Sequence, residues 1–195
     1  FVGGDTLAKT TLFQIITGEL KADSGDFKWG VTITPAYFPK ESSSFFDVDL
    51  NLINWLRQYS EEKEEQFIRG FLGRMLFSGD ETLKKVNLLS GGEKVRCMLS
   101  RMMVTGANVL IFDEPVSHLD LEGINALNQG LINFPEVVLF NTHDHQFIET
   151  MANRIIEFTP GGVIDMKMTF EEYLTDENVK AKRDELNHGH QRMIL

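Results

Sequence analysis

The chain has 195 residues, of which 42% are hydrophobic and 25% are charged, and its formal net charge at pH 7 is -10. This length suits one domain, or one with a small subdomain, and the acidic balance argues against gripping nucleic acid with the whole surface, because phosphate binding needs a basic face. The one cysteine, Cys97, excludes an intramolecular disulfide, and no apolar run approaches the roughly 18 residues that cross a bilayer. We therefore expect a cytoplasmic protein without direct membrane insertion.

Four short apolar runs predict buried strands, because they are too short for helices and lack the alternation of a half-exposed strand. These runs are residues 1–2, 109–112, 137–140 and 155–156. The first leads straight into a glycine loop, so we expect the chain to be a piece whose N-terminal strands are missing.

Helical patterns alternate with these runs. Residues 10–17 carry apolar residues up to Gly18, and residues 90–104 have a broad apolar face. Residues 27–38 predict antiparallel strands, whereas 47–76 predict two helices that form a helical insert. The alternation predicts an α/β fold with a mostly parallel sheet.

Residues 3–11 have the composition of a phosphate-binding loop between a strand and a helix. They are Gly3, Gly4, Asp5, Thr6, Leu7, Ala8, Lys9, Thr10 and Thr11. In such a loop, backbone N–H groups surround the phosphates, the lysine reaches the outer phosphate oxygens and the hydroxyl binds Mg²⁺. Ala8 stands where the pattern has its last glycine, so an ordinary glycine loop before Lys-Thr-Thr is the alternative.

A second glycine motif opens the helix that holds Cys97. It consists of Ser90, Gly91, Gly92 and Glu93, which suit an anion-binding turn at a helix N-terminus. The same serine and glutamate also form a capping-box pattern, and both interpretations can hold together.

Polar residues follow two of the predicted strands. Asp113 and Glu114 come directly after residues 109–112, and His143 comes after residues 137–140. One carboxylate directed at Mg²⁺ and one directed at a water molecule would provide what nucleotide hydrolysis needs, and a histidine can donate to a γ-phosphate. The alternatives are that Asp113 and Glu114 belong to an ordinary acidic loop and that His143 is a loop histidine without a function.

The order of these motifs along the chain resembles that of the ATP-binding cassette (ABC) family over almost the whole sequence. The resemblance implies a P-loop nucleotide-binding domain over residues 1–186, with a mostly parallel sheet, a small antiparallel β part and a helical subdomain at about 47–104. Residues 187–195 would then be a frayed tail.

The resemblance also implies ATP and Mg²⁺ as cofactors. The loop of residues 3–11 would hold the phosphates, with Thr10 and Asp113 near the metal. Glu114 would activate the water and His143 would contact the γ-phosphate. Lys40 stands at the Q-loop position and Asp120 in the D-loop. Residues 90–93 would contact ATP on a second, head-to-tail cassette, either in the same polypeptide or in a homodimer.

Three stretches look like the ABC-F subfamily, in particular its YbiT-like branch. They are residues 118–120, 71–77 and 154–160. Proteins of that branch carry two cassettes joined by a charged linker that reaches into the ribosome, and the ending of this chain fits the second cassette. The ribosome would thus be met through segments outside this chain, without a basic nucleic-acid surface on the cassette.

Departures from the family pattern predict weakened ATP binding. Thr6 and Ala8 replace loop glycines, and Lys40 replaces the usual glutamine. A left-handed Ala8 would cost about 1–2 kcal/mol, or about five- to thirty-fold in affinity. The leading hypothesis is an ATPase cassette of an ABC-F translation factor. The alternatives are the ATPase subunit of an ABC transporter, and a degenerate cassette that acts as a dimerisation or regulatory module.

Overall fold

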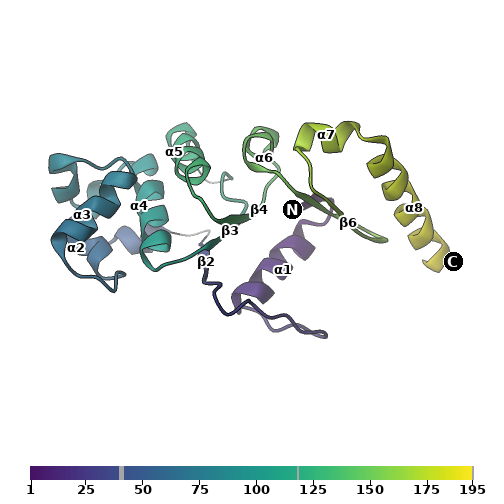
Figure 1. Cartoon of the computed structure of the whole chain (residues 1–195), viewed down its shortest axis with the longest axis horizontal. Helices are drawn as coiled ribbons and strands as arrows, with labels where there is room; N and C mark the ends of the chain where they lie inside the picture. Colours follow the sequence, from purple (N-terminus) through teal and green to yellow (C-terminus); the bar gives the residue numbers. More distant parts are fainter. Residues whose placement is uncertain (40–41, 118, 195) are drawn as a thin grey trace. The chain divides into compact units, whose positions relative to one another are not determined.

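The structure is a computed structural model that describes residues 1–39, 42–117 and 119–194, with side chains described up to residue 187. Lys40 and His118, both singled out from the sequence, lie outside the described residues. The chain divides into two compact units. The first unit comprises Phe1–Asp26 and Phe140–Leu195, and the second unit comprises Phe27–Leu139 (Figure 1).

The first unit is built on a three-stranded sheet of order β1-β5-β6. Strand β1 pairs parallel with β5, and β5 pairs antiparallel with β6. The elements of this unit are β1 (Val2–Gly3), α1 (Thr6–Thr17), α6 (His145–Met151), β5 (Ile155–Thr159), β6 (Gly162–Met166), α7 (Phe170–Thr175) and α8 (Glu177–Ile194). The strands predicted at 1–2 and 155–156 therefore form, but of their residues only Ile155 is buried and the others are half-buried, so the prediction of buried strands holds only in part.

Helix α1 ends where the sequence predicts. Gly18 adopts a left-handed conformation with φ 83°, and its N–H bonds to the carbonyls of Gln14 and Ile15. Glycine is favoured there because it has no Cβ to strain this conformation. The helix begins earlier than predicted, at Thr6, because the Asp5 side chain caps it.

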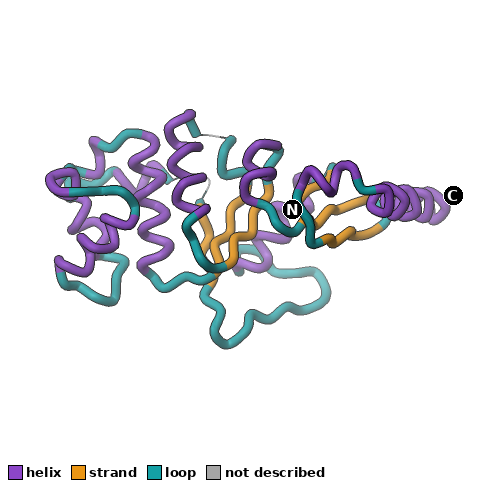
Figure 2. The backbone as a smooth tube through the Cα atoms, turned by 45° about the horizontal axis from the view of Figure 1, so that its top comes forward, coloured by secondary structure: helices purple, strands orange, loops and turns teal. Residues whose placement is uncertain are grey.

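The second unit contains a parallel pair of strands and the helices around them. Strands β2, β3 and β4 lie in that order (Figure 2), and all five residues of β3 are buried. Strand β4 crosses the boundary between the units, since its last two residues belong to the first unit. The strand bounds are β2 (Pro35–Phe38), β3 (Val109–Asp113) and β4 (Val137–Asn141).

The prediction of antiparallel strands over residues 27–38 is wrong. Only β2 forms there, and it pairs parallel with β3, from Pro35 opposite Val109 to Phe38 opposite Phe112. Val31 is 99% exposed and Trp29 and Ile33 are only half-buried, so the preceding segment has no fully buried apolar side chain that would stabilise a strand. The antiparallel part of the fold is instead the hairpin of β5 and β6.

Helices α2, α3 and α4 gather as a helical part of the second unit (Figure 1). Trp55 anchors it, because its ring stacks on Phe46 at 5.2 Å and its Nε1 donates to the Phe45 carbonyl at 2.7 Å. The elements are η1 (Ser43–Phe46), α2 (Leu52–Arg57), α3 (Glu65–Arg74), η2 (Gly79–Leu83), η3 (Val86–Leu88), α4 (Gly91–Val104) and α5 (Leu121–Ile132). The two helices predicted within 47–76 are confirmed.

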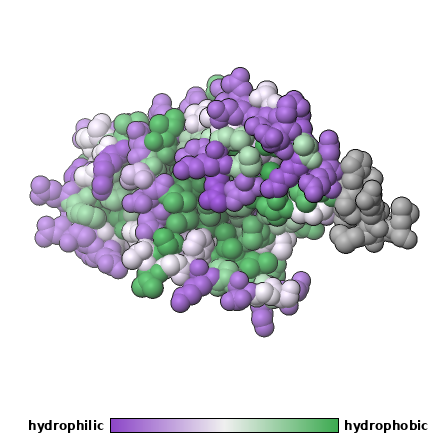
Figure 3. Space-filling model, turned by 45° about the vertical axis from the view of Figure 1, so that its right-hand side comes forward, coloured by the Kyte–Doolittle hydropathy of each residue, from purple (hydrophilic) through white to green (hydrophobic). Residues whose placement is uncertain are grey.

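Figure 3 shows hydrophobic areas exposed among hydrophilic residues on this face of the molecule. Among the residues described, no helix combines the length and the apolar character that crossing a bilayer requires. The boundaries of a single nucleotide-binding domain over 1–186 stay a prediction, and α8 runs on through the predicted tail to Ile194.

A half-buried carboxylate holds the C-terminal helices onto the first sheet. Glu157 of β5 accepts the Tyr173 hydroxyl of α7, and each of its oxygens accepts the Arg183 Nε of α8 at 3.0 Å. The Glu157 side chain is only 14% exposed. Burial raises the pKa of the Tyr173 hydroxyl, and the bond to Glu157 raises it further, so the tyrosine stays a donor.

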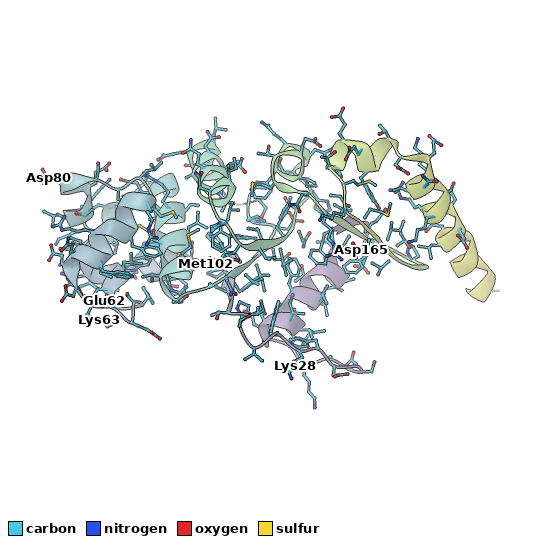
Figure 4. All side chains as sticks on the ribbon, viewed as in Figure 1. Lys28, Glu62, Lys63, Asp80, Met102 and Asp165 are labelled. Carbon is cyan, nitrogen blue, oxygen red and sulfur yellow. The ribbon has the colours of Figure 1, made fainter. Side chains whose placement is uncertain are left out.

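We expect Glu157→Ala to lower the free energy of unfolding by about 2–4 kcal/mol, because it leaves the Tyr173 hydroxyl and the Arg183 cation without their acceptor. Urea denaturation measures the loss. The matched control is Asp165→Asn, which breaks the exposed ion pair of Arg154 and Asp165 (2.6 Å; Asp165 is labelled in Figure 4) and should cost far less, because water screens exposed charges. Equal losses would contradict a special role for Glu157.

Candidate nucleotide-binding site

The predicted phosphate loop connects β1 to α1 in the first unit. Gly3 has φ +114°, and a Cβ on it would lie 2.3 Å from the Phe158 carbonyl oxygen. Only glycine fits this close approach, because any side chain would push β1 away from β5. Asp5 then caps α1, accepting the N–H of Ala8 at 3.0 Å. The strand, loop and helix thus follow one another as predicted.

Lys9 lies on the first turns of α1 and its side chain is 0% exposed. Its Nζ donates to the Gly3 carbonyl at 3.1 Å, which holds the ammonium against the start of the loop. Thr10 and Thr11 follow at half-buried positions of the same helix. The Lys9 cation therefore lies against the start of the loop, and the two threonines follow it along the helix.

Ala8 is part of α1 and is exposed. Among the described residues other than glycine, only Leu76 and Glu114 have positive φ, so Ala8 does not adopt a left-handed conformation. The affinity penalty expected for a left-handed alanine therefore does not apply to this loop.

His143 meets the phosphate loop. Its Nε2 lies 3.1 Å from the Thr6 hydroxyl oxygen, although 137 residues separate the two in the sequence. Asp144 caps α6 by accepting the N–H of Phe147 at 2.8 Å, which fixes the turn that carries the histidine. The structure thus brings together the two predicted features of the first unit.

A pocket of about 730 Å³ opens beside the loop, within the first unit. Gly4, Asp5 and Ala8 form one wall, and residues 158–163 at the turn of β5 and β6 form the other. This volume lies in the range of cofactor pockets.

In the second unit, Asp113 ends β3 and is 3% exposed, and Glu114 follows it. Glu114 has φ +49°, a conformation that costs a residue with a side chain about 1–3 kcal/mol and that concentrates at functional sites. The hydroxyl and the N–H of Ser117 both bond to the Glu114 carbonyl, at 2.8 and 3.3 Å, and hold the turn. No pattern in the sequence predicts this strained backbone conformation.

The two carboxylates share a pocket of about 230 Å³ with the start of α4. Gly91 lines this pocket together with Asp113 and Glu114, and Phe38 of β2 closes it. The structure therefore brings the predicted acidic pair and the second glycine motif together within the second unit.

The capping box of α4 is confirmed. Ser90 accepts the N–H of Glu93 at 3.3 Å, and the Glu93 carboxylate accepts the N–H of Ser90 at 2.6 Å. Burial acts to raise the pKa of the Glu93 carboxyl, but bonds from Lys84 and Ser90 outweigh it and hold that pKa below its usual value. In this structure Glu93 shapes the turn.

The start of α5 packs against the same motif. A Cβ on Gly91 would lie 3.0 Å from an oxygen of Asp120, and one on Gly92 would lie 2.6 Å from Cγ of Glu122. The Ser90 hydroxyl donates to Glu122 at 2.9 Å, while Asp120 caps α5 by accepting the N–H of Gly123 at 2.8 Å. Sequence reasoning missed Glu122, because no motif marks it.

The oxygen donors suit Mg²⁺. A threonine hydroxyl and a carboxylate, Thr10 and Asp113, are the ligand types that this ion takes from proteins alongside phosphate oxygens and water. Within the described part of the chain, no group of three or more His, Cys, Asp or Glu side chains could hold a metal ion by itself.

Comparison with known proteins gives a family match, three relatives and one similar solved structure. Residues 1–117 match the family model described as "ABC transporter". The chain is 61% identical over 188 residues to the uncharacterized ABC transporter ATP-binding protein YkpA of Bacillus subtilis, covering 95% of this chain and 35% of that protein. It is 37% identical over 180 residues to the probable ATP-binding protein YbiT of Escherichia coli O157:H7, with coverages of 92% and 34%.

A further relative is the energy-dependent translational throttle protein EttA of Haemophilus influenzae, 32% identical over 174 residues, with 88% of this chain and 31% of that protein covered. The chain thus spans about a third of the length of these curated relatives. The solved structure of CbiO1 from Clostridium perfringens superimposes with a TM-score of 0.66 at 20% identity, over 100% of this chain and 86% of that one. The predicted α/β fold with its parallel sheet is confirmed.

Proposed function

The chain belongs to the ABC transporter family and is ABC-F-like, and on that premise we propose that it binds ATP with Mg²⁺ and hydrolyses it. The observation that carries the proposal is the first unit's loop, where the buried Lys9 bonds to Gly3 and the exposed His143 lies against Thr6, so that both meet one strand-to-helix turn. Such a turn directs N–H groups and a positive helix end toward an anion.

Lys9, Thr10 and Thr11 would hold the phosphates, and Thr10 and Asp113 would hold the ion. Bound Mg²⁺ draws negative charge from the phosphate oxygens. Glu114 accepts a proton from the attacking water while the water oxygen bonds to the γ-phosphorus and the bond to the bridging oxygen breaks. His143 donates a hydrogen bond to a γ-phosphate oxygen.

The partner in this proposal is a second cassette, in the same polypeptide or in a homodimer, whose ATP meets residues 90–93. The chain would be the second cassette of a cytoplasmic, ribosome-associated translation factor. The relative named as a translational throttle supports this, and so does the ABC-F-like sequence. Ribosome contacts would come from segments outside this chain.

One observation favours the second candidate, the ATPase subunit of a transporter, because the 61% identical relative is named as an ABC transporter ATP-binding protein. Two experiments on the full-length protein distinguish the candidate functions. Co-sedimentation with ribosomes supports the translation role, whereas capture of a membrane protein in a pull-down supports the transporter role.

Calorimetry with Mg-ATP tests the nucleotide site itself. We expect the chain to bind Mg-ATP and Lys9→Ala to weaken binding by about ten- to a hundred-fold, because it removes a charged hydrogen-bond donor to the phosphates. The matched control is Lys21→Ala, an exposed lysine of the same unit, which should leave the affinity unchanged. If the parent chain bound no nucleotide at millimolar concentration, the proposal would fail and the degenerate cassette would stand.

A further inference from the structure

Asp5 occupies the phosphate loop with a negative charge of the chain's own. Its Oδ1 accepts the N–H of Ala8 at 3.0 Å, at the N-terminus of α1. Backbone N–H groups of this turn are the donors that phosphate oxygens take up in a phosphate loop. A nucleotide that enters the loop therefore meets the Asp5 carboxylate at the Ala8 N–H, a group that could otherwise bind a phosphate oxygen.

Within residues 3–11 the one cationic side chain is Lys9, and it is held at another group. The Lys9 ammonium lies buried and bonds to the Gly3 carbonyl, whereas Asp5 is exposed on the side of the loop that lines the pocket of about 730 Å³. The Thr6 hydroxyl also occupies a group that we propose for phosphate binding. It lies 3.1 Å from His143 Nε2, which would contact a γ-phosphate. The Asp5 carboxylate and the Thr6 hydroxyl thus contact two groups, the Ala8 N–H and His143, that would otherwise be available to phosphate oxygens.

Repulsion between Asp5 and a nucleotide grows with the charge of the ligand. Free ATP carries about four negative charges, and a bound Mg²⁺ cancels about two of them, so the carboxylate penalises the free nucleotide about twice as strongly. The contact lies near the surface, where water and salt reduce but do not remove the difference.

We propose that Asp5 is a specificity-determining residue that makes the loop discriminate against free ATP in favour of Mg-ATP. The inference rests on the proposed function of the same loop and goes beyond it, because it concerns which form of the nucleotide is admitted. Asparagine at this position caps a helix as well as aspartate does but carries no charge, so Asp5→Asn removes the repulsion and keeps the turn.

Calorimetry on the whole chain tests this, with ATP in the presence of excess Mg²⁺ and with ATP in the presence of a chelator. In Asp5→Asn we expect free ATP to bind about tenfold more tightly and Mg-ATP about threefold more tightly, so the preference for Mg-ATP falls about threefold. Raising the salt from about 0.05 to about 0.5 M should shrink the difference between variant and parent, because the repulsion is screened.

The matched control is Asp176→Asn. Asp176 also caps a helix, accepting the N–H groups of Asn178 and Val179 at 2.7 and 3.0 Å in the same unit, so the substitution changes the net charge equally. It should leave both affinities and their ratio as in the parent chain.

Binding with an unchanged preference for Mg-ATP in Asp5→Asn would overturn the inference and leave the nucleotide site standing. A shift of equal size in Asp176→Asn would overturn it too, because net charge alone would then explain the effect. Absence of any nucleotide binding in all three chains would overturn the proposed function and this inference with it.

Discussion

Replacing Glu114 with glutamine should reduce ATP hydrolysis by about 10²- to 10⁴-fold while ATP binding persists, because an amide cannot accept the proton of the attacking water. Glu114 and Asp113 line one pocket at the end of β3, so the substitution leaves in place the Asp113 carboxylate that we propose to hold Mg²⁺. Glutamine meets the same backbone strain at φ +49° as glutamate does, so the turn should persist. Phosphate release under single-turnover conditions measures the rate.

The matched control for this variant is Glu136→Gln, an exposed carboxylate of the same unit, which should hydrolyse ATP at the parent rate. The Glu114 variant should also accumulate the closed, ATP-bound pair of cassettes, which size-exclusion chromatography detects. If Glu114→Gln released phosphate as fast as the parent chain, another group would have to be the base.

Gly3→Ala should destabilise the first unit by about 3 kcal/mol or more. An alanine Cβ would lie 2.3 Å from the Phe158 carbonyl oxygen, and the backbone at φ +114° is one that residues with side chains rarely adopt. Strain of about 1–3 kcal/mol therefore adds to a similar cost of moving β1 away from β5. Urea denaturation gives the free energy of unfolding.

The neighbouring glycine provides the comparison. A Cβ on Gly4 would meet nothing within 4 Å, so Gly4→Ala should change the free energy of unfolding by less than about 1 kcal/mol. Similar losses in the two variants would mean that the close approach of Gly3 to Phe158 does not limit the packing of β1 on β5.

The buried elements could be predicted because burial leaves a pattern. The run at 109–112 became the fully buried β3, and the helix starting at Ser90 formed with its capping box. The segment 27–38 was predicted wrongly, because its aromatic and β-branched residues are typical of antiparallel strands. Instead Asn108 binds the backbone there, accepting the N–H of Thr34 at 2.8 Å and donating to the Thr32 carbonyl at 2.7 Å.

The site could be predicted as a set of motifs but not as a geometry. The contact of Thr6 with His143 joins residues far apart in the sequence, and motif order alone gives no such distance. The left-handed backbone of Glu114 and the bond of Glu122 to Ser90 depend on tertiary packing. Glu93 and Asp120 take part in helix capping, which the structure shows, and their contact with nucleotide stays a prediction.

Glu157 also couples the stability of the N-terminal strand of the first unit to that of its C-terminal helices. It is the β5 residue that stands opposite Val2 in the parallel register, and it is the acceptor for Tyr173 and Arg183. Opening of the C-terminal helices and opening of the strand that leads into the phosphate loop therefore share one anchor. Local unfolding at either end should weaken the other, so the loop and the last helix form one cooperative unit although they come from opposite ends of the chain.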